Sequence, residues 1–168
     1  LDVVSWDSYP DQSEHPSAVA LRHDLMRGLK GGQSWLLMEQ TPSSQNWQPV
    51  NALKRPGVMR LWSYLAVAHG SDSVMYFQWR RGRGGSEKFH GAVVEHGRDP
   101  SARVFHEVSQ LGDEFGCLQQ RAEGDEYRAD AGERNRDLHP LHAIGHDQPD
   151  PGAFADRRGD ECRSQVAG

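Results

Sequence analysis

A carboxylate closes a short apolar run in the segment SWLLMEQTPSSQNWQPVN, which covers residues 34–51. That residue, Glu39, is suited to nucleophilic or acid-base chemistry, because partial burial and neighbouring groups can tune a carboxyl group there. Trp47 follows in a polar loop, where its ring can stack on the apolar face of a sugar. Position alone leaves two alternatives open: Glu39 as an ordinary charge at a strand end, and Trp47 as a loop anchor packed on the rim of the fold.

A second group of polar residues lies in GGSEKFH, residues 84–90. Glu87, Lys88 and His90 provide donors and acceptors that can bind adjacent hydroxyls of a sugar, although a solvated turn explains them equally well. Glycoside hydrolysis normally needs two carboxyl groups, a nucleophile or base and an acid. Asp7 lies at a suitable strand end, but nothing else in the sequence supports it as that acid.

Three further features of the sequence bear on partners, metals and cellular compartment. WRRGRGG, residues 79–85, looks like an RNA-binding arginine-glycine segment, but it is one short copy in a chain of net charge -5, so we expect no nucleic-acid partner. HPLHAIGHD, residues 139–147, lies where few apolar residues could hold a fixed geometry, so we expect no metal site. Cys117 and Cys162 form no C-x-x-C unit and indicate a reducing compartment, which predicts a cytoplasmic protein.

The elements that must position these residues alternate between strands and helices. The predicted strands are residues 2–10, 34–40 and 73–80, and the predicted helices are 16–30, 56–70 and 101–115. Apolar strands separated by helices favour a parallel sheet covered on its faces, in either a doubly wound sheet or part of a (β/α)8 barrel. Both architectures bind ligands at the carboxyl ends of the strands. The candidate residues gather at those ends.

Composition changes near the end of the third predicted helix. From Gln119 onward the chain has no sustained period and too few large apolar residues to offset the entropy of ordering. We therefore divide the chain into a folded domain, residues 1–117, and a tail, residues 118–168, that we expect to be disordered. No apolar run approaches the roughly 20 residues that cross a bilayer, so we expect no membrane contact.

LLMEQTPSSQNWQPVN and KRPGVMRLWSYLAVAHGSDSVMYFQWRRGRGGSEKFH closely resemble the β-galactosidases of glycoside hydrolase family 42. The resemblance begins near SWDSYP and ends near VFHEVSQLGDEF. It implies a partial (β/α)8 TIM barrel of about three βα units, from a parent enzyme that is often trimeric. The implied activity is retaining hydrolysis of terminal β-D-galactosides, with no cofactor. The resemblance also implies that Glu39 is the nucleophile, and that Trp47, Glu87 and His90 bind galactose.

The chain also departs from this family. The family's acid/base glutamate, in an Asn-Glu pair, and the cysteine cluster that holds zinc in some members both belong to earlier strands. We therefore expect a gene fragment, with a 3′ end read in a shifted frame, that aggregates and does not hydrolyse β-galactosides by itself. The alternative is a non-catalytic carbohydrate-binding or structural remnant.

Overall fold

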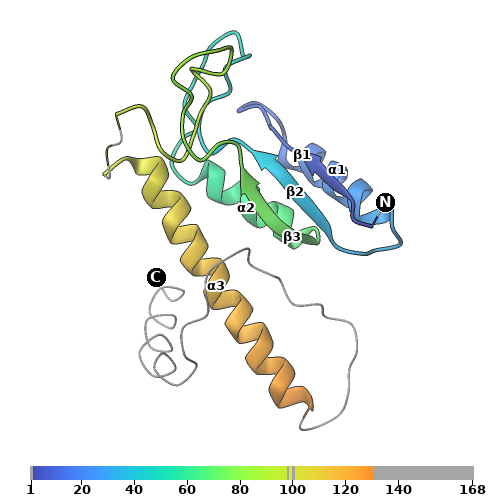
Figure 1. The fold of residues 1–168 in the computed structure, drawn as a ribbon. Helices are drawn as coiled ribbons and strands as arrows, with labels where there is room; N and C mark the ends of the chain where they lie inside the picture. Colours follow the sequence, from blue (N-terminus) through green and yellow to red (C-terminus); the bar gives the residue numbers. More distant parts are fainter. Residues whose placement is uncertain (1, 98, 100, 131–168) are drawn as a thin grey trace. The chain divides into compact units, whose positions relative to one another are not determined.

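Strands and helices alternate along the chain, as the sequence predicts (Figure 1). The computed structural model describes residues 2–97, 99 and 101–130. Within that part, the order of elements is β1 (Ser5–Asp7), α1 (Pro16–Gly28), β2 (Trp35–Gln40), α2 (Val58–Ala68), β3 (Ser71–Tyr76) and α3 (Arg103–Asp130). The chain divides after Leu111 into two compact units, and the candidate residues all lie in the first.

The three strands form one parallel sheet in the order β1-β2-β3, which confirms the α/β class with a parallel sheet. Trp6 of β1 pairs with Leu37 of β2, and Asp7 pairs with Glu39. Since the strands are parallel, their carboxyl ends share one edge, and the loops that follow β2 and β3 run together beyond it (Figure 1). The predicted gathering of polar residues at this edge is a direct result of that topology.

The middle strand carries the core. Trp35 and Leu37 of β2 are fully buried and pack with Ala66 of α2. His23 of α1 is also buried and stacks on Trp35, with ring centroids 4.9 Å apart. β2 has a strand on each side, and helical residues cover its apolar side chains. Its sequence is therefore a short apolar run that becomes polar only at its end.

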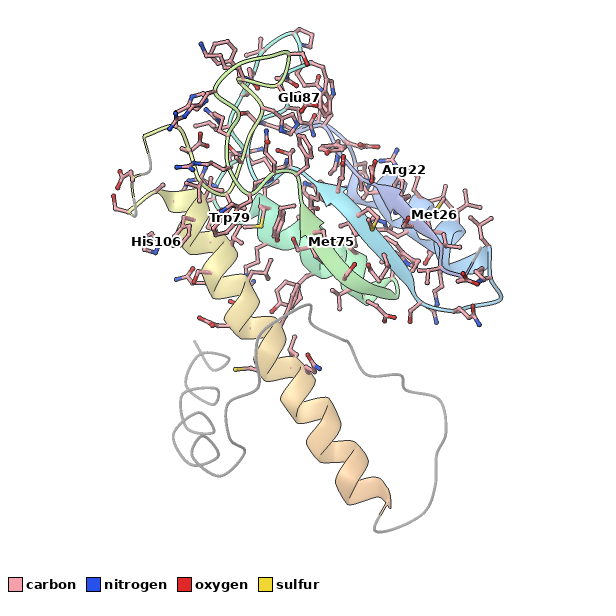
Figure 2. The ribbon with its side chains drawn as sticks, viewed as in Figure 1. Arg22, Met26, Met75, Trp79, Glu87 and His106 are labelled. Atoms are coloured by element: carbon pink, nitrogen blue, oxygen red, sulfur yellow. The ribbon has the colours of Figure 1, made fainter. Side chains whose placement is uncertain are left out.

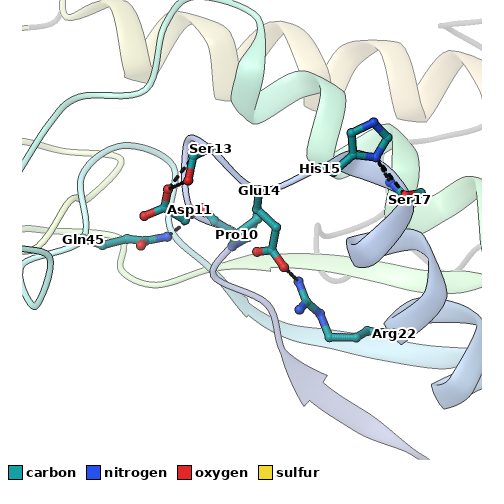
Figure 3. A network of polar contacts seen from close by, with 8 residues as sticks. All are labelled: Pro10, Asp11, Ser13, Glu14, His15, Ser17, Arg22 and Gln45. Atoms are coloured by element: carbon teal, nitrogen blue, oxygen red, sulfur yellow. Dashed lines mark hydrogen bonds and ion pairs between the residues drawn. The ribbon is translucent and has the colours of Figure 1, made fainter.

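Local polar contacts fix the connection between β1 and α1 (Figure 3). His15 caps α1 by accepting a hydrogen bond from the backbone N–H of Ser17, and Pro16 occupies the first turn, where it removes no helical hydrogen bond. Glu14 forms an ion pair with Arg22 of α1. The Gln45 side chain donates to the carbonyl of Pro10 at 3.1 Å, so the loop after β2 is tied to the loop after β1.

Several predicted strand boundaries are wrong. β3 begins at Ser71 rather than residue 73. Gly70, with φ of 90°, follows the preceding helix, and the strand begins at the next residue. β3 also ends at Tyr76, because residues beyond it pair with a later segment: the backbone N–H of Val93 donates to Gln78 O at 2.9 Å. β1 is likewise shorter than residues 2–10.

The predicted disorder of residues 118–168 is not confirmed at its start. Helix α3 continues to Asp130, past the residue at which the apolar pattern fades, so residues 118–130 are helical. The rest of the predicted tail, including the histidine motif at 139–147, lies outside the described residues. Of the described helices, none has the length and hydropathy that a membrane span requires.

Candidate active site

Glu39 lies half-buried at the carboxyl end of β2, next to Asp7 of β1 in the sheet register. The Tyr9 hydroxyl donates to Glu39 Oε2 at 2.6 Å. Burial raises the pKa of Tyr9 well above its usual range, and the hydrogen bond to Glu39 raises it further. Tyr9 therefore remains a proton donor at neutral pH and fixes the orientation of the Glu39 carboxylate.

Asp7 shares this edge of the sheet with Glu39. Desolvation raises the pKa of Asp7 above its ordinary value, and the negative charge of Glu39 adds to the effect. The charge of Glu39 at the neighbouring strand end thus opposes the ionisation of Asp7, although Asp7 is largely exposed. A raised pKa is the direction that a general acid needs. The raised pKa is thus one observation in favour of Asp7 as the acid. The structure shows no contact that would assign it to that role.

An aromatic group surrounds the Tyr9–Glu39 pair. The ring centroid of Tyr9 lies 5.0 Å from that of Trp47, edge to face, and 5.9 Å from that of His90. Trp47 and His90 lie 5.1 Å apart. Trp47 remains 55% exposed, so much of its indole surface is available to a ligand. The structure thus brings together Glu39, Trp47 and His90, with Tyr9 as the residue that touches all three.

His90 is fully buried, and its two ring nitrogens have different roles. Nδ1 lies 3.0 Å from the carbonyl oxygen of Gly91, and since a carbonyl only accepts, Nδ1 carries the proton. Nε2 is buried without a partner among the described residues and, in this tautomer, is an acceptor. A hydroxyl group is the kind of donor that it can accept from, once the atoms that cover this nitrogen in the structure move aside.

Glu87 occupies a different environment from the other predicted residues. It is exposed on the loop that follows β3, and Figure 2 shows it among the loops beyond the sheet edge. Its negative charge is one of the smaller contributions that raise the pKa of Tyr9, which links it electrostatically to the Tyr9–Glu39 pair. The structure therefore places Glu87 on the same side of the sheet but shows no direct contact of its carboxylate with Glu39, Trp47 or His90.

Hydrogen bonds to backbone carbonyls join the loop that carries Trp47 to the loop that carries His90. The backbone N–H of Gly91 donates to Ser44 O at 2.8 Å, and the Asn46 side chain donates to Ser86 O at 2.7 Å. A Cβ at position 91 would lie only 2.7 Å from Ser44 N, so the close approach of the two loops requires glycine. These contacts hold the aromatic group in place.

Buried polar side chains connect the strands and the helix from which these loops extend. The Gln40 side chain donates to Ser63 Oγ at 2.8 Å, and Ser63 Oγ lies 2.8 Å from the hydroxyl of Tyr76, which connects β2, α2 and β3. Nearby, Lys54 is 4% exposed, and its ammonium donates to Thr41 O at 2.9 Å and to Ser43 O at 3.2 Å. Burial lowers the pKa of Lys54 to about 7.

Sequence reasoning missed Tyr9 as a site residue. A single tyrosine forms no recognisable charge pattern or sequence motif, and the role of Tyr9 depends on the pairing of β1 with β2. The available signal was its position two residues beyond Asp7, at the end of the strand next to the Glu39 strand. As for metal binding, the described residues contain no cluster of three potential His, Cys, Asp or Glu ligands.

Comparison with known proteins identifies relatives over the first two-thirds of the chain. Residues 1–118 match the model of glycoside hydrolase family 42, described as beta-galactosidase. A β-galactosidase of Planococcus sp. (strain 'SOS Orange') is 61% identical over 118 residues, which are 70% of this chain and 17% of that enzyme. A β-galactosidase of Geobacillus sp. (strain Y412MC61) is 53% identical over 116 residues, 68% of this chain and 17% of that enzyme.

A solved structure gives the same result. The crystal structure of a β-galactosidase from Bacillus circulans sp. alkalophilus is similar with a TM-score of 0.68 and 60% identity, over 70% of this chain and 18% of that one. The chain thus spans less than a fifth of the length of these relatives. Since the family match covers well over half of the chain, the resemblance expected from the motifs is confirmed. The chain belongs to glycoside hydrolase family 42, the β-galactosidase family.

Proposed function

We propose that this chain is a section of the catalytic barrel of a retaining β-galactosidase, in which Glu39 is the nucleophile. The observation that carries the proposal is the position of Glu39: it closes a parallel strand, its carboxylate accepts from Tyr9 at 2.6 Å, and an exposed Trp47 lies beside the same tyrosine. The β1-β2-β3 order is that of neighbouring strands in a (β/α)8 barrel, and the section would supply about three βα units.

The chemistry follows from these positions. Glu39 attacks the anomeric carbon of a terminal β-galactoside, forming a galactosyl ester as the bond to the aglycone oxygen breaks. A separate acid protonates the departing oxygen and then removes a proton from the water that hydrolyses the ester, which releases galactose and frees Glu39. Tyr9 orients the nucleophile, Trp47 stacks on the sugar, and His90 Nε2 accepts from a sugar hydroxyl. Glu87 accepts from another hydroxyl at the outer side.

A chimeric enzyme tests the assignment of Glu39. Residues 1–118 of this chain replace the matching segment of the Planococcus β-galactosidase, and hydrolysis of an aryl β-galactoside is measured. We expect an active chimera in which Glu39→Ala lowers kcat by at least about 10³-fold. Azide should then restore turnover of a substrate with a good leaving group and give the α-galactosyl azide, since azide enters the face that Glu39 vacates.

The matched control is Glu107→Ala, which removes a carboxylate of α3 that pairs with Arg103. We expect this variant to retain kcat within about twofold. Formation of the β-azide, or no loss of activity in Glu39→Ala, would show that Glu39 is not the nucleophile. A failure of the intact chimera to hydrolyse, with galactose still bound, would favour the alternative of a non-catalytic carbohydrate-binding remnant.

The isolated 168-residue chain is expected to be inactive, because the proposed acid lies outside it. The trimeric state of a parent enzyme and a cytoplasmic location stay predictions.

A further inference from the structure

We infer that the loop after β3 forms a binding pocket for a phosphate or sulfate group. A cavity of about 260 Å³ opens in this loop, and every residue that lines it is basic: Arg80, Arg81, Arg83, Lys88 and His96. This pocket is distinct from the group formed by Tyr9, Glu39, Trp47 and His90, none of which lines it. It therefore does not depend on the proposed galactosidase activity.

The pocket is part of a hydrogen-bonded frame. Arg80 pairs with Val94 in a parallel bridge, and the backbone N–H of Arg81 donates to Val94 O at 2.9 Å. The N–H of Val94 donates in turn to Trp79 O at 2.8 Å. His96 Nε2 lies 2.7 Å from the carbonyl of Gly82, to which it donates. These contacts join residues 79–82 to residues 94–96. The backbone that carries the basic side chains is therefore held by hydrogen bonds on both sides of the cavity.

Most of the positive charge in the pocket is uncompensated. Arg81 forms an ion pair with Glu95 at 2.8 Å. Within the described part of the chain, Arg80 and Arg83 have no carboxylate partner, and Lys88 instead lies over the ring of Phe89, 5.3 Å from its centroid. Like charges around one cavity repel each other, so an oxyanion bound among them removes that repulsion and gains charge-assisted hydrogen bonds.

The chemistry of the donors points to a compact oxyanion. Two guanidinium groups provide planar pairs of N–H donors, which match the oxygens of phosphate or sulfate, and the lysine adds a point charge. The chain as a whole carries a net charge of -5, which gives it no general attraction for a nucleic acid. The group can arrive as free inorganic phosphate or on a sugar phosphate.

Binding of phosphate to the full chain tests the inference. The 168-residue chain, fused to a soluble domain without affinity for phosphate, is titrated by isothermal calorimetry with inorganic phosphate, galactose 6-phosphate and galactose at constant ionic strength. We expect a saturable 1:1 site for phosphate with a Kd of about 1 mM or lower. We expect Arg83→Gln and Lys88→Gln each to weaken it about five- to tenfold. Arg83→Lys should weaken it less than Arg83→Gln.

The control is Arg55→Gln, which makes the same change of charge at an exposed residue outside the pocket. It should leave the Kd within about twofold. Tighter binding of galactose 6-phosphate identifies a sugar phosphate as the source, and equal binding identifies the free anion. Absence of saturation, equal weakening by Arg55→Gln, or binding of single-stranded RNA much tighter than that of phosphate would each overturn the inference. Circular dichroism verifies that every variant retains its helical content.

Discussion

Replacing Gly91 by alanine should force apart the two loops that carry Trp47 and His90. An added Cβ would lie 2.7 Å from Ser44 N, 2.8 Å from Ser44 O and 2.9 Å from Thr41 Oγ1. Two of these atoms belong to the backbone, so they cannot rotate away as a flexible side chain can. The hydrogen bond from the Gly91 N–H to Ser44 O, now 2.8 Å, must lengthen or break.

The magnitude follows from two contributions. Overpacking at a tight contact typically costs about 1–3 kcal/mol. Loss of a buried hydrogen bond that leaves its groups unsatisfied costs about 1–3 kcal/mol more. The free energy of unfolding should therefore fall by about 2–6 kcal/mol. At about 2–4 °C for each kcal/mol in a protein of this size, the midpoint of thermal unfolding should drop by about 4–24 °C.

Gly84→Ala provides the matched control for this prediction. Gly84 lies in the same loop, its added Cβ meets nothing within 4 Å, and its φ is not in the left-handed region. Thermal unfolding followed by circular dichroism, on the chain at low concentration, should give a control midpoint within about 2 °C of the wild type. In the chimera, Gly91→Ala should also lower kcat/KM, because it displaces His90. If Gly91→Ala and Gly84→Ala unfold alike, the two loops are not joined as described.

Two further substitutions probe the site and its support. Tyr9→Phe removes the 2.6 Å hydrogen bond to Glu39, so the chimera should lose about tenfold or more in kcat/KM, and an unchanged value would show that orientation of Glu39 by Tyr9 does not contribute to activity. For Lys54, burial lowers the folded-state pKa from 10.5 to about 7, so the unfolded state binds more protons in between, and stability should rise with pH. Between pH 7 and 9, urea unfolding should show the wild type gaining about 1–2 kcal/mol relative to Lys54→Met, whereas parallel pH profiles would contradict this.

The order of elements and the position of Glu39 were predictable because they depend on local patterns. A buried middle strand must be apolar on both faces, and its first polar residue marks where it leaves the sheet. The end of β3 was not predictable in the same way. Trp79 and Arg80 continue the apolar and extended pattern, but they pair outside the sheet, with residues near Val94, and such long-range pairing leaves no local periodicity.

The interactions within the site depend still more on tertiary structure. Nothing in the motifs predicts that Tyr9 bonds Glu39, because the two residues lie on different strands and meet only through the register of β1 with β2. The length of α3 was missed for another reason: residues 118–130 lack the apolar spacing by which a helix is recognised, although few of them disfavour helix. Glu87 was placed on the correct side of the sheet, but its direct role stays a prediction.

The contact between Gly91 and Ser44 links the evolution of two loops that are far apart in sequence. A side chain at position 91 would be tolerated only if the backbone near position 44 shifted outward, and that shift would move Trp47. Insertions in one loop should therefore be accompanied by changes in the other among related enzymes. Segment exchanges between relatives should therefore transfer residues 41–51 and 86–91 together, because replacing either segment alone would disrupt the contact between them.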